Sequence, residues 1–95
     1  DPVADTFIRK YKEKFGIVPD ALGALGYDST VILLKALDSV KKITQEEIMT
    51  ALSSVKNYKG VTGTISFDKN GDAIKSAAIL KVEKDGFKYL TTINP

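Results

Sequence analysis

The side chains best suited to chemistry are few, and none of them forms a recognisable catalytic pair. The chain contains no cysteine and no histidine, which excludes thiolate chemistry, cysteine-based zinc sites and the commonest general base. Two neighbouring carboxylates, Glu46 and Glu47, would lie about 100° apart on a helix. That spacing suits the capping of a helix rather than acid–base work. We expect no catalytic residue and no enzymatic activity.

The run Asp68-Lys69-Asn70-Gly71-Asp72 has the alternating oxygen donors of a calcium loop. An EF-hand loop requires glycine at its sixth position and glutamate at its twelfth, and those places hold Ala73 and Ile79. The pattern therefore favours a polar β-turn, and neither a metal nor another cofactor is expected.

A cluster of basic residues in the first part of the chain resembles a phosphate-facing stripe: Arg9, Lys10, Lys12 and Lys14. Glu13 interrupts it, and no exposed aromatic residues alternate with the charges as in single-strand binders. The formal net charge is only +2. We interpret the cluster as a solvated helix face and expect no nucleic-acid partner.

Composition limits the class of protein. Ninety-five residues make one small domain or a piece of a larger one. A hydrophobic content of 43% with 27% charged residues is typical of a globular chain. No apolar run is as long as a membrane span, and the first five residues do not resemble a signal peptide. Thirteen lysines against one arginine favour a thermophilic source.

Three helices are predicted to position these residues. Asp1 is expected to cap the first helix, which carries Pro2 in its first turn and ends at Gly16. The second is expected to start near Asp20 and to run to about Val40. The third is predicted to begin with a capping box at Thr44–Glu47 and to end near Lys56. All three have apolar residues at helical spacing.

The second predicted helix is apolar around most of its circumference, with a narrow polar stripe of Asp28, Lys35 and Ser39. This pattern predicts burial on more than one side. Gly23 and Gly26 lower helix propensity, so we expect another part of the backbone to approach closely there.

After the helices the apolar period changes from 3.6 residues to two. Strands are predicted at 64–67, 77–83 and 87–93, with turns at Asn70–Gly71 and Asp85–Gly86. The fold class is therefore α+β: three helices followed by a small antiparallel three-stranded sheet or hairpin.

The order of these motifs resembles a known family. The quoted segments are Phe15-Gly16-x-x-Pro19, Gly26-Tyr27-Asp28-Ser29, Glu47-Ile48-x-x-Ala51-Leu52, Gly60-x-Thr62-Gly63-x-Ile65-x-Phe67-Asp68-x-x-Gly71-Asp72 and the Asp85–Gly86 hairpin. They are similar to the C-terminal part of type I periplasmic binding proteins of the leucine/isoleucine/valine kind. These are the solute receptors of branched-chain amino acid ABC transporters.

The resemblance implies a two-lobed α/β receptor, periplasmic or otherwise extracytoplasmic, that holds an amino acid between its lobes and presents it to a membrane permease. Residues 1–76 would belong to the first lobe. Residues 77–95 would form a hairpin of the second lobe, after the hinge crossing. This mapping makes Gly60, Gly63, Gly71 and Ala77 hinge-adjacent.

One ligand contact is also implied. The position five before the tyrosine of Gly-Tyr-Asp faces the cleft in such receptors, and here it is Leu22. The remaining binding segments of the family are absent, so the 95-residue chain alone is not expected to bind an amino acid.

Other interpretations stay open beside these. Leu22 and Tyr27 fit core positions, the latter with a hydroxyl reaching a partner, and Asp28 fits a surface or local hydrogen-bonding position. The chain as a whole also fits a self-contained α+β interaction module or an engineered scaffold. Exposed apolar faces would then favour a homo-oligomer formed by exchange of the 77–93 hairpin.

Overall fold

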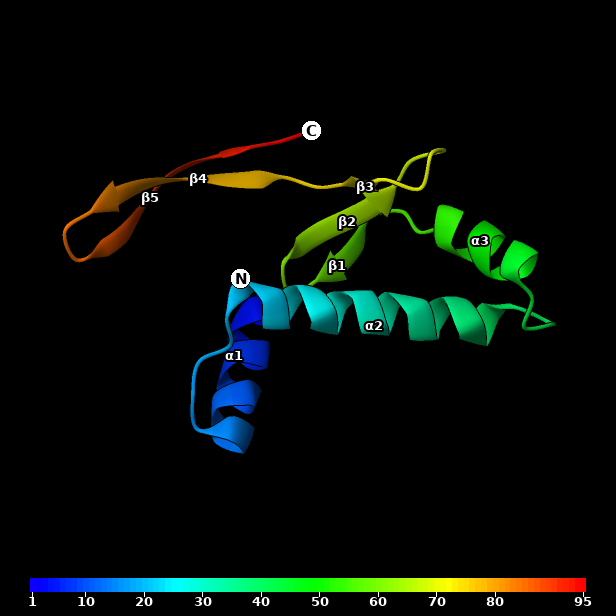
Figure 1. The fold of residues 1–95 in the computed structure, drawn as a ribbon, viewed down its shortest axis with the longest axis horizontal. Helices are drawn as coiled ribbons and strands as arrows, with labels where there is room; N and C mark the ends of the chain where they lie inside the picture. The colour runs from blue at the N-terminus through cyan, green and yellow to red at the C-terminus, as the bar shows by residue number, and fades with distance from the viewer.

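The computed structural model describes all residues 1–95, which form three helices followed by five short strands (Figure 1). The elements are α1 (Pro2–Phe15), α2 (Ala21–Ser39), α3 (Gln45–Ser53), β1 (Tyr58–Gly60), β2 (Gly63–Phe67), β3 (Ala73–Ile74), β4 (Ala77–Glu83) and β5 (Gly86–Ile93). The helices-then-strands order confirms the α+β class.

The strands form two separate antiparallel units. One is a three-stranded sheet in the order β1-β2-β3, and the other is the β4–β5 hairpin. Figure 1 shows the small sheet beside α2, α3 packed near the far end of α2, and the hairpin extending away from this body. The C-terminal strands therefore do not extend the sheet that contains β2.

Two of these strands were not predicted. The expected strand at 64–67 is β2, but its partners β1 and β3 have only three and two residues. Segments this short cannot show a period-two pattern, so the sequence carries no signal for them. They become strands because β2 offers them hydrogen-bonding edges, pairing Tyr58 with Ile65 and Ile74 with Ser66.

The helix termini follow local capping chemistry. The Asp1 carboxylate accepts a hydrogen bond from the Val3 amide at 2.9 Å. Gly16 ends α1 with φ 79° and donates to the Lys12 carbonyl. Thr44 accepts from the Glu47 amide at 3.2 Å, which confirms the cap.

The third helix is shorter than predicted. It ends at Ser53, not near Lys56. The chain tightens there, because the Ser54 amide also bonds to the Ala51 carbonyl and the Val55 amide bonds to the Leu52 carbonyl, three residues back instead of four. Lys56 instead donates from its side chain to the Phe67 carbonyl at the end of β2.

Little of the chain is buried. The buried apolar residues are Ile32, Ala36 and Ile65, and only five of 95 residues are buried in all. The radius of gyration is 15.7 Å, whereas a compact chain of this length has about 12 Å. Contrary to expectation, α2 is buried on one side only, the side that faces the sheet and α3.

That buried face of α2 includes Asp28, which is 2% exposed. Its carboxylate accepts hydrogen bonds from the Val61 amide at 2.8 Å, the Thr62 amide at 2.9 Å and the Thr62 hydroxyl at 2.5 Å. The prediction of a surface or local role for Asp28 is therefore wrong. The carboxylate binds the β1–β2 turn, 33 residues away, and so attaches the sheet to the helix.

Close approach of another segment occurs at Gly60 rather than at Gly26. A Cβ atom on Gly60 would lie 2.6–2.7 Å from the Asp28 carboxylate, whereas one on Gly26 would meet no atom within 4 Å. At Gly23 the nearest contact, at 3.1 Å, is with the helix's own cap, Asp20. Only a residue without Cβ lets the β1–β2 turn reach Asp28.

We predict that Gly60→Ala lowers the free energy of unfolding by about 1–3 kcal/mol, because its methyl group would overlap the Asp28 carboxylate. Gly26→Ala is the matched control. It adds the same methyl group in open space and should raise stability by about 0.5–1 kcal/mol through helix propensity. Denaturant titration measures both, and equal effects of the two substitutions would contradict the prediction.

Candidate functional site

Leu22 lies in the first turn of α2. The helix begins there because the Asp20 carboxylate accepts a hydrogen bond from the Gly23 amide at 2.7 Å. The Leu22 side chain is 78% exposed, so the interpretation of this residue as part of the core is wrong for this chain. A large apolar side chain is thus held at a capped helix end, free to contact another molecule or segment.

The three glycines expected beside the hinge lie in two places in the fold. Gly60 and Gly63 are opposite each other across the β1–β2 turn, where Gly63 has φ 120° and accommodates the chain reversal. Gly71 is at the other end of β2, in the turn leading to β3. The structure therefore brings Gly60 and Gly63 together and places Gly71 apart from them.

The Asp68–Asp72 segment is a closed polar turn, as predicted. The Asp68 carboxylate accepts from the amides of Asn70 and Asp72 at 2.8 and 2.9 Å. The Gly71 amide donates to the Asp68 carbonyl. No three His, Cys, Asp or Glu side chains gather closely enough in the chain to hold a metal ion.

Lys75 and Ser76 connect β3 to β4, immediately before Ala77. β3 runs antiparallel to β2, so the chain leaves it in the direction of Gly63. There the Lys75 ammonium donates to the Thr62 hydroxyl at 2.8 Å. The same hydroxyl donates to Asp28, so a continuous hydrogen-bonded chain joins α2, the β1–β2 turn and the connection.

The β4–β5 hairpin beyond this connection is attached by the chain alone. No hydrogen bond or ion pair joins residues 76–95 to residues 1–75. Every residue of both strands is exposed, including the apolar side chains of both faces. An isolated two-stranded hairpin is marginally stable at best in water, and this one has neither a further strand nor a buried face to stabilise it.

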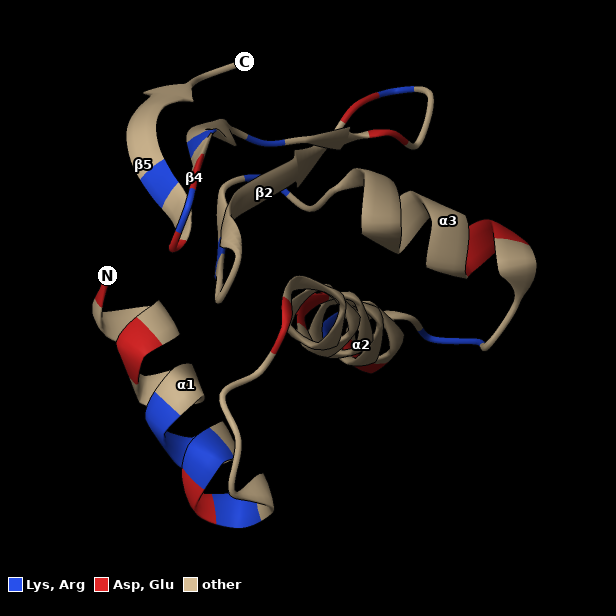
Figure 2. Cartoon of the chain, turned by 60° about the vertical axis from the view of Figure 1, so that its left-hand side comes forward, with Lys and Arg blue, Asp and Glu red and all other residues tan.

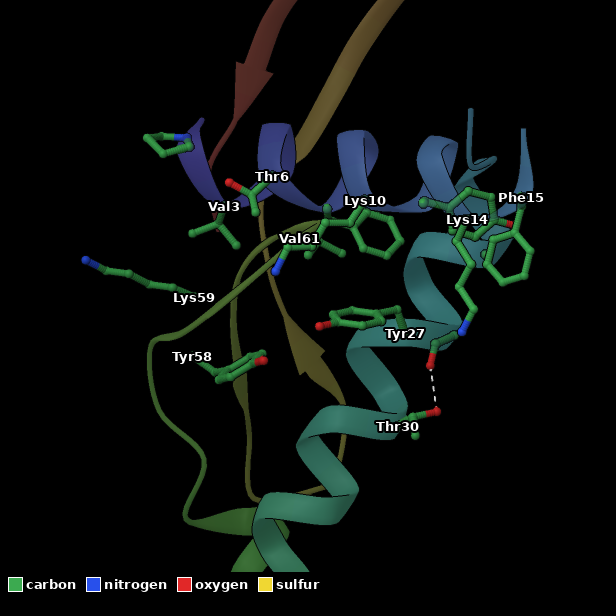
Figure 3. Close-up of a pocket in the computed structure, with 15 residues that line it drawn as sticks. Val3, Thr6, Lys10, Lys14, Phe15, Tyr27, Thr30, Tyr58, Lys59 and Val61 are labelled. Atoms are coloured by element: carbon green, nitrogen blue, oxygen red, sulfur yellow. Dashed lines mark hydrogen bonds between the residues drawn. The ribbon is translucent and has the colours of Figure 1, made fainter. Parts of the chain in front are cut away.

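An open groove of about 880 Å³ separates α1 from α2 and the β1–β2 turn (Figure 3). Aromatic side chains line much of it. The ring of Phe7 lies 4.7 Å from that of Tyr27 and 5.8 Å from that of Tyr11. Tyr27 is 47% exposed and its hydroxyl bonds no protein group, so it is not the hydrogen-bonded core residue that was predicted.

The sequence indicates one wall of this groove but not the other. The helical spacing of Phe7, Tyr11 and Phe15 indicated one apolar face. The facing side chain of Tyr58 comes from β1, whose strand had no sequence signal. Only the attachment of the β1–β2 turn to α2 brings the two walls together.

Tyr58 is the one residue whose titration the structure clearly alters. Partial burial raises the pKa of its hydroxyl, and the negative charge of Asp28 and the neighbouring Tyr27 raise that pKa further. The Lys35 ammonium lies 4.8 Å from the centre of the Tyr58 ring, as a cation–π contact. Lys35, predicted in the polar stripe of α2, therefore also faces the sheet.

The basic residues of α1 gather in the second half of that helix (Figure 2). All four are exposed, and Arg9 pairs with Glu13 of the next turn at 3.0 Å. This agrees with a solvated helix face. Separately, no helix combines the length and apolarity needed to cross a bilayer.

Residues 1–87 match the protein family described as periplasmic binding protein. No curated protein sequence matches the chain. A leucine-binding protein of Thermotoga maritima is 40% identical over the whole chain, with a TM-score of 0.85. The thermophilic source expected from composition fits this relative.

Two further solved structures are similar over 95% of the chain. One is an ABC transporter substrate-binding protein of Desulfitobacterium hafniense in complex with Leu, at 27% identity and a TM-score of 0.84. The other is a candidate branched-chain amino acid ABC transporter protein of Rhodospirillum rubrum, at 32% identity and a TM-score of 0.77. The chain spans 27% of the length of each of these three proteins.

The raised pKa of Tyr58 predicts a pH-dependent stability. The folded chain holds the phenol proton of Tyr58 more tightly than the unfolded chain does. The protonated phenol therefore favours the folded state, fully below about pH 10 and less as pH rises through the folded-state pKa. Tyr58→Phe keeps the ring and removes the titration. Denaturant titrations from pH 9 upward should show a shallower loss of stability in the variant; parallel curves would contradict the prediction.

Proposed function

Because the chain belongs to the periplasmic binding protein family, we propose that it is the C-terminal part of an extracytoplasmic solute receptor. This receptor binds amino acids of the branched-chain type and delivers them to an ABC permease in the membrane. Its role is binding and presentation rather than catalysis.

The observation that carries the proposal is the similarity to a leucine-binding protein along the entire chain, at 40% identity. A second relative was solved with leucine bound. The low burial supports the same conclusion, because α2 and the hairpin present apolar faces that the remaining receptor segments would cover. A self-contained interaction module would be expected to bury more of its apolar residues.

We propose that residues 1–76 belong to one lobe and that residues 77–95 belong to the other. The separation of the hairpin from the helical body supports this division. Gly60 and Gly63 then lie beside the crossing between lobes, with Ala77 as the first residue after it, while Gly71 lies one turn earlier in the chain. Exchange of the hairpin between two copies has no support among the similar proteins.

In such a receptor the amino acid binds between open lobes, and contacts from both sides stabilise the closed form. Leu22 would provide part of the apolar wall for the ligand side chain. Its exposure at a rigid, capped helix end supports that role. Leucine has no hydrogen-bonding group, so it would favour apolar ligand side chains over charged ones.

The proposal predicts that the complete receptor binds leucine, isoleucine or valine more tightly than lysine or glutamate. The 95-residue chain alone should bind none of them, because most of the segments that form the binding site in such a receptor lie outside it. Isothermal calorimetry with both proteins measures this. Tight leucine binding by the short chain, or equal affinity of the complete receptor for charged amino acids, would contradict the proposal.

We predict that Leu22→Ala in the complete receptor weakens leucine binding by about 5- to 30-fold. This corresponds to about 1–2 kcal/mol of lost apolar contact. Ile43→Ala is the control, since Ile43 is also an exposed aliphatic residue but follows the far end of α2. The helix is about 28 Å long. Calorimetry should show unchanged affinity for the control, and an unchanged affinity for Leu22→Ala would remove this residue from the site.

A further inference from the structure

Two parts of the chain meet at Lys75 and Ser76. Before this connection, residues are bonded to the helical body: β3 pairs with β2 through Ala73 and Ile74. After it, no hydrogen bond or ion pair returns to the body. The orientation of the hairpin is therefore determined by the backbone at this connection and by whatever holds its first residue.

The side chain of Lys75 is bonded to the body of the chain. Its ammonium donates to the Thr62 hydroxyl at 2.8 Å, and that hydroxyl donates to the buried Asp28 carboxylate at 2.5 Å. The lysine and aspartate are thus a charge pair bridged by one hydroxyl, and each hydrogen bond polarises the next. Lys75 is half-buried and lines, with Ile32 and Ile65, a cavity of about 310 Å³.

We propose that Lys75 is a positioning residue that fixes the body side of the hinge. Its bond to Thr62 ends the rigid part of the connection at residue 75 and confines rotation to Ser76 and Ala77. The inference rests on the proposed receptor function, in which this rotation opens and closes the lobes. In this role Lys75 acts by limiting the range of lobe orientations, through its bond to Thr62.

The consequence for binding follows from population shift. Without the bond, the ligand-free receptor samples more orientations, and ligand must select the closed one from a broader set. The apparent dissociation constant rises by the factor by which the fraction of closing-competent orientations falls. A loss of order worth one ordinary hydrogen bond corresponds to a weakening of leucine binding by about five-fold. A change in the width of the orientation distribution would accompany it.

The test uses the complete receptor with spin labels at two exposed positions, Lys41→Cys on the body and Lys84→Cys on the hairpin turn. Double electron–electron resonance measures the distance distribution between them, with and without leucine. Lys75→Met should broaden the ligand-free distribution and weaken leucine binding about five-fold. Lys75→Arg, which keeps a charged donor, should restore both towards the unsubstituted values.

Lys69→Met is the matched control. It removes the same charge from an exposed lysine in the β2–β3 turn that makes no hydrogen bond, and it should change neither readout. A ligand-free distribution for Lys75→Met identical to that of the unsubstituted receptor would overturn the inference. If Lys75→Met fails to fold, Lys75→Gln is measured in its place, with the same expected and overturning results.

The two proposals fail in different ways. A receptor that neither binds leucine nor shifts its distance distribution on adding it would overturn the proposed function. The ligand-free comparison of Lys75→Met with the unsubstituted receptor still decides the role of Lys75 in that case.

Discussion

The Asp28 carboxylate holds the helical and sheet parts of this chain in one arrangement. It is buried on the side of α2 that faces the sheet. Its oxygens have hydrogen-bond partners there, because two successive backbone amides and a hydroxyl of the β1–β2 turn donate to them. Successive amides in a turn form a small anion-binding concavity. The buried carboxylate is therefore satisfied by three hydrogen bonds, whereas an unpaired one would be costly.

Several other features depend on that contact. Gly60 must lack a side chain, because the turn approaches the carboxylate within the space a Cβ would need. The contact also places Tyr58 next to Lys35. Tyr58 belongs to β1, and this strand forms one wall of the aromatic groove. Thr62 is placed where its hydroxyl can also receive Lys75. The connection to the hairpin is thereby bonded to the body at its first residue, Lys75.

The chain thus combines a bonded body with an unbonded extension. Residues 1–75 share one network of helix, sheet and side-chain contacts, whereas the hairpin has only its internal ladder. This combination fits the proposed two-lobed receptor, in which a crossing segment would be anchored in one lobe and move with the other. The exposed apolar faces fit the proposed receptor, in which further segments would cover them.

Local sequence determined the elements whose signals lie within a few residues. Asp1, Asp20 and Thr44 capped the predicted helices, and Gly16 and Asp85–Gly86 marked a helix end and a hairpin turn, because these interactions span two to four residues. The order of motifs was also sufficient to indicate the family. Tertiary structure alone decided the rest. β1 and β3 form only because they pair with β2. Asp28 is buried because it binds the β1–β2 turn, whose residues lie 33 positions away in the sequence. No local pattern reports the position of a distant hydrogen-bond partner. The sequence therefore placed Asp28 in a polar stripe of the helix, whereas the structure shows that it joins the helix to the sheet.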